Sequence, residues 1–163
     1  MNLEIDIEEP WPAQPEWEAL AAKAVDAAAL VALELAHARL TASVLFTSDQ
    51  DIHALNAEWR GKDKPTNVLS FPMLERSDLV DLAPEGPPEM LGDIALAYET
   101  CAREAAEKGV AVEHHAAHLI VHGMLHLAGY DHETSDEDAD VMEALETKAL
   151  AVMGLADPYG PRL

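Results

Sequence analysis

Three histidines in the C-terminal half of the chain have the spacing of a metal site. His122 and His126 lie four residues apart in an apolar run of helical period, Val112 to Ala128, so they point from one helix face about a turn apart. Gly129 is expected to end this helix with a left-handed cap, and the returning chain would carry His132 towards the same point. Three imidazoles leave one tetrahedral position open, as catalytic zinc requires. We therefore predict that His122, His126 and His132 ligate one divalent ion.

The other histidines of this run are predicted to serve packing or support. Six of the eight histidines fall between positions 114 and 132, so several pairs four residues apart could compete for an ion. His118 and His126 are separated by roughly 12 Å of helix rise, too far to share one ion. A third ligand must therefore come from outside the helix. For His114, His115 and His118 the prediction is packing or contact with the ligands.

A metal site of this kind could hydrolyse a phosphate ester, because of what its bound ion does to water and to the substrate. The ion can lower the pKa of a bound water to about 7 and polarise a phosphoryl oxygen. Arg60 is the predicted catalytic partner, since its guanidinium can pair with a second oxygen as charge builds there. Arg60, Lys62 and Lys64 are three of only ten basic residues in a chain of net charge −21. Such a local basic spot predicts phosphate binding by Lys62 and Lys64 in one cleft, and weak, salt-sensitive binding of a free polyanion.

Each of these roles has a competing explanation. Arg60 could form only a surface ion pair. Asp131 is a candidate to accept a hydrogen bond from a ligand imidazole, or it is simply a turn residue. A metallopeptidase would need a glutamate after the first histidine, and that position is Gly123, so proteolysis lacks its usual base.

The elements expected around these residues form one domain over residues 1–163. Apolar alternation and periodicity predict strands over 3–7, 41–47, 67–73 and 91–97, and helices over 16–40, 49–59, 98–108, 112–128 and 135–153. Thr134 with Glu137 is the expected capping box of the last helix. Residues 74–90 are expected to be a surface connector, with a lid as the alternative, and 158–163 a frayed tail. Strands alternate with helices early and helices gather late, which is typical of an α/β to α+β domain.

Composition restricts where the chain works. Cys101 is its only cysteine, so no internal disulfide can form and a reducing compartment fits. The N-terminus is acidic and alternating, unlike a signal peptide. No apolar run approaches the roughly 18 residues that a membrane span needs. We therefore expect a soluble, cytoplasmic protein without a membrane partner.

Three blocks of the chain resemble the YbeY family, the metal-dependent endoribonucleases of ribosomal RNA maturation. The first is the histidine segment from His122 to His132. The second runs from Arg60 to Pro72, and the third from Leu91 to Leu96. The blocks follow the family's order, and the resemblance covers roughly residues 43–139. The N-terminal third and the tail match only in general layout.

The resemblance implies a mixed four-stranded sheet packed with about five helices, the histidine-bearing helix being central. It also implies a single-strand-specific endoribonuclease that acts on the 3′ end of small-subunit ribosomal RNA and in ribosome quality control. Its partners would be single-stranded RNA and the small subunit or its assembly proteins, with no role for DNA. Zinc is the expected ion, although imidazoles also accept nickel, copper or iron. The alternative is a non-enzymatic assembly factor whose ion is purely structural.

Overall fold

The computed structural model describes residues 1–13 and 15–159 of the chain. Within these residues it has four strands, six α-helices and one 3-10 helix: β1 (Asn2–Ile7), α1 (Trp17–Val31), η1 (Leu33–Leu35), β2 (Leu40–Thr47), α2 (Asp49–Arg60), β3 (Val68–Pro72), α3 (Arg76–Val80), β4 (Glu89–Ala97), α4 (Tyr98–Lys108), α5 (Val112–Leu127) and α6 (Asp136–Val152). Residues 160–163 of the predicted tail lie outside this range.

The four strands form one mixed sheet in the order β1-β2-β4-β3. β1, β2 and β4 run parallel, whereas β3 pairs antiparallel with β4. β2 alternates between buried and half-buried residues over most of its length, the pattern that predicted it as a strand. The expected mixed four-stranded α/β architecture is confirmed.

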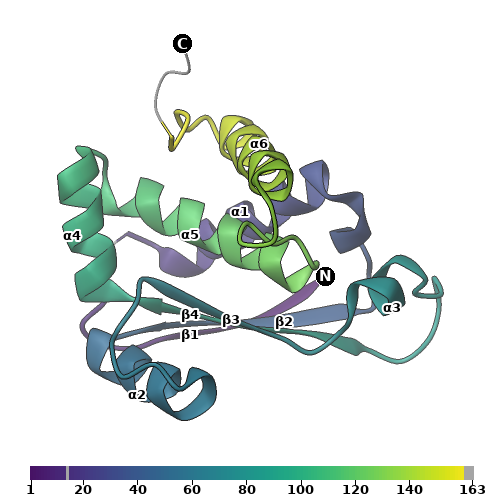
Figure 1. The fold of residues 1–163 in the computed structure, drawn as a ribbon, viewed down its shortest axis with the longest axis horizontal. Helices are drawn as coiled ribbons and strands as arrows, with labels where there is room; N and C mark the ends of the chain where they lie inside the picture. The colour runs from purple at the N-terminus through teal and green to yellow at the C-terminus, as the bar shows by residue number, and fades with distance from the viewer. Residues whose placement is uncertain (14, 160–163) are drawn as a thin grey trace.

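The sheet is covered unequally on its two faces (Figure 1). α1, α5 and α6 lie over one face, and the larger hydrophobic core fills the space between them and the sheet. The other face carries α2, above a small cluster of Ile52, Leu69, Ala95 and Ala97. α5 lies in the middle of the covered face and is buried along most of its length, so the histidine-bearing helix is central, as expected.

Gly123 explains how closely α5 approaches the sheet. A Cβ at this position would lie 3.0 Å from Cδ1 of Ile94 on β4, tighter than ordinary van der Waals contact. The glycine that the sequence places after His122 therefore serves helix–sheet packing. It also fixes α5 directly over β4.

The predicted helix over 16–40 is too long. α1 ends at Val31, and η1 and an irregular turn lead to β2. The apolar pattern misled because Leu30 and Leu33 are 63% and 73% exposed, so apolar residues there do not mark a buried helix face.

The predicted capping box of the last helix is wrong by one residue. Ser135, not Thr134, is the N-cap of α6, and its hydroxyl accepts a hydrogen bond from the backbone N–H of Asp138. Ser and Thr stand side by side there, and both types are good caps.

The predicted loop over 74–90 contains α3 and the first residues of β4. It is tied to the body of the protein at several points. The Arg39 guanidinium donates hydrogen bonds to the carbonyls of Ala83 and Pro87, and Arg76 donates to the carbonyl of Ala128 at 2.7 Å. These contacts fit the connector that we expected.

Candidate metal centre

The three predicted ligands come together at the C-terminal end of α5. Gly129 follows this helix with a φ of 100°, a conformation that favours glycine. The next residue, Tyr130, donates its N–H back to the carbonyl of Leu125. This reversal brings His132 over the helix end, so His122, His126 and His132 each offer a ring nitrogen within 4.8 Å of the others.

The protonation of these rings fits a bound cation. His122 Nδ1 lies 2.6 Å from Oε1 of Glu146 and donates to it, which leaves Nε2 with its lone pair. That Nε2 faces Nε2 of His126 at 3.0 Å. Two imidazole nitrogens approach so closely only with a proton or a cation between them. The donor set therefore suits a divalent ion of intermediate softness.

His126 is held in the neutral form that metals bind. Burial, together with the neighbouring rings of His122 and His132, lowers its pKa to about 4. At neutral pH the ring is therefore uncharged and carries a single proton, so one of its two nitrogens has a lone pair for a metal.

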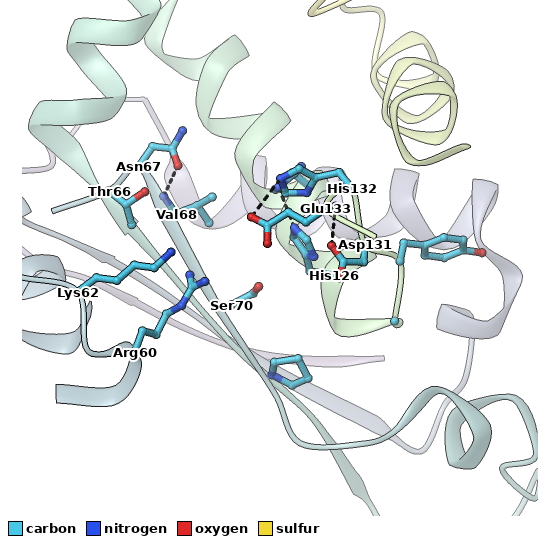
Figure 2. A pocket seen from close by; sticks show the side chains of 14 residues that line it. Arg60, Lys62, Thr66, Asn67, Val68, Ser70, His126, Asp131, His132 and Glu133 are labelled. Atoms are coloured by element: carbon cyan, nitrogen blue, oxygen red, sulfur yellow. Dashed lines mark hydrogen bonds and ion pairs between the residues drawn. The ribbon is translucent and has the colours of Figure 1, made fainter. Parts of the chain in front are cut away.

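The three histidines face a cavity of about 680 Å³. Figure 2 shows Arg60 and Lys62 on the side of this cavity opposite His126 and His132. Thr66 and Ser70 also line it. The cavity therefore has a cationic wall and an imidazole wall, with the Ser70 hydroxyl between them, and the carboxylates of Asp131 and Glu133 lie on the imidazole side.

The basic wall is positioned by the end of α2. Arg60 is the last residue of α2, and Gly61 caps the helix with a φ of 66°. The side chain of Asn56, a residue only 1% exposed, donates to the carbonyl of Lys64, and the backbone carbonyl of Asn56 accepts a hydrogen bond from the backbone N–H of Lys62. Sequence reasoning did not single out Asn56, which fixes the path of the basic loop.

Lys64 is placed differently from the other two basic residues. Among the described residues that line the cavity, Arg60 and Lys62 are present and Lys64 is not. The phosphate contact predicted for Lys64 therefore gains no support from the cavity and stays a prediction.

The carboxylate that contacts a ligand imidazole is Glu146, which the sequence analysis missed. It lies 24 residues beyond His122, on α6, with its side chain 1% exposed. One signal could have found it: Met142 and Leu150 are buried on the same helix, and Glu146 falls midway between them on that face. An acidic residue at an apolar-face position is rarely without a partner.

Asp131 fits the simpler of its two explanations. Its Oδ1 accepts a hydrogen bond from the backbone N–H of Glu133 at 2.8 Å, and the residue is exposed. Asp131 therefore shapes the turn that carries His132.

The remaining histidines of α5 pack or support, as predicted. His115 is buried and contacts Glu104 at 2.9 Å. His118 is buried beside Glu146, and His114 contacts the carbonyl of Ala156. Cys101 is fully buried on α4, and burial raises the pKa of its thiol to about 12.

The fold places a three-histidine group opposite a cationic wall, an arrangement that suits a metal-dependent hydrolase. The family model described as Endoribonuclease YbeY matches residues 5–154. The chain therefore belongs to the endoribonuclease YbeY family, a family of enzymes that hydrolyse RNA.

The similarity extends over nearly the whole chain. A relative from Erythrobacter litoralis is 66% identical over 162 residues, covering 99% of both chains. One from Novosphingobium aromaticivorans is 60% identical over 158 residues, covering 96% of this chain and 95% of the relative. Both are named endoribonuclease YbeY. A solution structure from Thermotoga maritima is similar with a TM-score of 0.57 and 25% identity, covering 98% of this chain and 99% of that one.

None of the helices in residues 1–13 and 15–159 combines the length and the apolar character that crossing a membrane requires.

Proposed function

We propose that this chain is a single-strand-specific, metal-dependent endoribonuclease that trims the 3′ end of small-subunit ribosomal RNA and takes part in ribosome quality control. The observation that carries the metal-dependent part is the convergence of three ring nitrogens within 4.8 Å at one wall of a cavity, opposite Arg60 and Lys62. Membership of an endoribonuclease family supports RNA as the substrate. We treat residues 1–163 as one domain that performs this reaction.

The residues divide the work between the two walls of the cavity. His122, His126 and His132 would hold the ion, which when bound supplies a more acidic water and polarises a phosphoryl oxygen. Arg60 pairs with a non-bridging phosphate oxygen as negative charge builds in the transition state. Lys62 holds the phosphate backbone as a point charge, and the hydroxyls of Thr66 and Ser70 orient it.

Zinc is the ion that we propose. Three neutral imidazoles with one open position are typical of catalytic zinc. Among the described residues, no fourth histidine, cysteine or carboxylate belongs to the group. This argues against a closed structural site, and so against the alternative of a non-enzymatic assembly factor.

A protein partner would help to place the RNA. The net charge of −21 repels a polyanion at long range, while the cavity attracts phosphate only locally. We therefore propose that the small ribosomal subunit, or an assembly protein bound to it, presents single-stranded RNA to the cavity in the cytoplasm.

The test is cleavage of labelled single-stranded and duplex RNA by zinc-loaded protein, with zinc measured by elemental analysis. Arg60→Ala should slow cleavage by about 100-fold, the loss typical of one transition-state donor, and retain its zinc. Lys23→Ala is the control, because Lys23 is exposed on α1 and does not line the cavity, and it should change the rate by less than about threefold.

Three outcomes would contradict the proposal. Equal cleavage of duplex RNA would remove the strand specificity. Loss of zinc in Arg60→Ala would give Arg60 a structural role, and undiminished cleavage by that variant would remove its catalytic role.

A further inference from the structure

The buried carboxylate of Glu146 contacts three side chains. Its Oε1 lies 2.6 Å from Nδ1 of His122 and 3.3 Å from Nε2 of His118. Its Oε2 accepts a hydrogen bond from the hydroxyl of Tyr159 at 2.5 Å. The carboxylate is thus held from α5 on one side and from the C-terminal segment on the other.

No lysine or arginine is among the partners of Glu146 in the described part of the chain. An ion buried without a countercharge costs several kcal/mol, and an apolar residue of similar size would often stabilise the fold as well or better. Folding stability alone therefore gives a weak reason for a carboxylate at the interface of α5 and α6. A cation bound by His122 would supply the missing countercharge across the ring.

His118 helps to hold the Glu146 carboxylate in one orientation. Nδ1 of His118 is buried without a hydrogen-bond partner. A buried N–H donor without a partner is rarer than an unpaired acceptor, so the proton of this ring belongs on Nε2, which faces Glu146. His118 and Tyr159 then both donate to the carboxylate and prevent it from turning away from His122.

We propose that Glu146 is the positioning residue of the metal centre. By accepting the proton of His122 Nδ1, it commits Nε2 to the ion, fixes the plane of the ring and increases the electron density that the ligand offers. His118 and Tyr159 hold Glu146 in turn. The inference rests on the proposed metal-dependent function, and it gives α6 and the C-terminal segment a part in that site.

A second pair on the same helix provides a matched control. His115 contacts Glu104 at 2.9 Å, also with a buried ring, but it neighbours no predicted ligand. Glu104→Gln and Glu146→Gln make the same chemical change in two histidine–carboxylate pairs on α5. Only the second change should alter metal binding.

The experiment measures the apparent zinc dissociation constant of the full chain by competition with a chromophoric chelator. Glu146→Gln should weaken zinc binding by about 10-fold and Glu146→Leu by up to about 100-fold, the range for loss of such a partner. Glu104→Gln should stay within about twofold of the unaltered protein. Thermal unfolding of each metal-free variant, followed by circular dichroism, shows whether the chain remains folded.

A merely structural Glu146 predicts a different pattern, in which the metal-free variants lose stability but the folded protein keeps its zinc affinity. That pattern, or unchanged affinity in both Glu146 variants, would overturn the proposal. If Glu146→Leu fails to fold, the isosteric Glu146→Gln decides.

The outcome is separable from that of the proposed function because zinc binding is read without RNA. Zinc bound with the expected dependence on Glu146 but without cleavage of RNA would refute the nuclease and leave the positioning role. Absence of zinc binding by the unaltered chain would refute both.

Discussion

Helix α5 carries two histidine–carboxylate pairs with similar geometry and different consequences. His122 approaches Glu146 through Nδ1 at 2.6 Å, and His115 approaches Glu104 through Nε2 at 2.9 Å. The other ring nitrogen of His122, Nε2, faces the imidazole of His126 at the wall of the cavity. The side chain of His115 is 3% exposed, and its ring lies outside the group formed by the three predicted ligands. The residue types are the same, and the orientation of the ring decides which pair can serve a metal.

The two carboxylates also differ in how they are stabilised. Burial alone would raise the pKa of Glu146, yet hydrogen bonds from His118 and His122 outweigh it and hold the pKa at about 2. Burial likewise opposes ionisation of Glu104, whose pKa is lowered by hydrogen bonds from His115 and Asn67. Glu104 thus accepts a hydrogen bond from the amide of Asn67 and lies near the cation of Lys108, whereas the partners of Glu146 among the described residues are two imidazoles and a phenol.

The largest expected difference is in zinc binding, between a variant at His126 near the end of α5 and a variant at His115 near its start. His126→Ala removes a predicted ligand, so zinc binding should weaken by more than about 100-fold, and RNA cleavage should be lost with it. His115→Ala should keep its zinc and lose only stability, by about 1–3 kcal/mol, because Glu104 loses a buried partner. Elemental analysis, cleavage and denaturant unfolding of both variants measure this difference. Loss of zinc in His115→Ala would contradict the comparison.

Acid should destabilise the metal-free protein in two separate ranges of pH. The folded pKa of His126 is about 4 and its usual value 6.5, so the unfolded chain takes up this proton first. The stabilisation is therefore present above about pH 6.5 and is lost as pH falls to about 4. Glu146, lowered from 4.5 to about 2, should lose its contribution between those two values.

Denaturant unfolding of the metal-free chain from pH 8 to pH 2 checks both ranges. His126→Ala should weaken the pH dependence in the upper range and Glu146→Gln that in the lower range. Part of each should remain, because the fold also lowers the pKa of His115 and that of Glu104. A free energy of unfolding that stays constant between pH 7 and 4 would show that His126 is not kept neutral by the fold.

The glycines at either end of α5 offer a second matched pair. A Cβ at Gly129 would lie 2.8 Å from Cβ of Arg76, and the φ of 100° is unfavourable for alanine. At Gly109, which has a φ of 68°, nothing lies within 4 Å. Gly109→Ala should cost about 1 kcal/mol and Gly129→Ala about 2–3 kcal/mol of unfolding free energy.

Only Gly129→Ala should also weaken zinc binding, by several-fold, since it disturbs the turn that carries His132. Unfolding and chelator competition on both variants test this. Equal zinc affinities in the two variants would mean that the turn tolerates the change.

The smallest effect is expected at Asp131. Its carboxylate is exposed and bonds only to the neighbouring turn. Asp131→Ala should change zinc affinity by less than about threefold and stability by about 0.5 kcal/mol. A loss of zinc affinity of 10-fold or more would mean that Asp131 also positions the ligands, a role that we assign to Glu146.

Local pattern predicted most of what these variants probe. Helical spacing and a stop glycine indicated the three converging histidines, and alternation or short runs of apolar residues indicated all four strands. Glu146 escaped because its contact with His122 spans two helices, and no periodicity within one helix reports the packing of another. The end of α1 escaped for a related reason, since the exposure of Leu30 and Leu33 is set by neighbours distant in sequence. Ring orientation, which separates His122 from His115, is likewise fixed only by tertiary contacts.

The contact between Gly123 and Ile94 has a consequence for how this enzyme can vary. The helix that bears two of the ligands rests on the sheet through a residue with no side chain. A methyl group there would shift the helix or Ile94 by a few tenths of an ångström. A shift of the helix would move the imidazole wall relative to Arg60, which is anchored on α2 beyond the opposite face of the sheet. The distance between the two walls of the cavity thus depends on one interatomic clearance inside the core. If the proposed site is correct, a small change in that clearance would alter turnover without changing a residue that contacts the substrate.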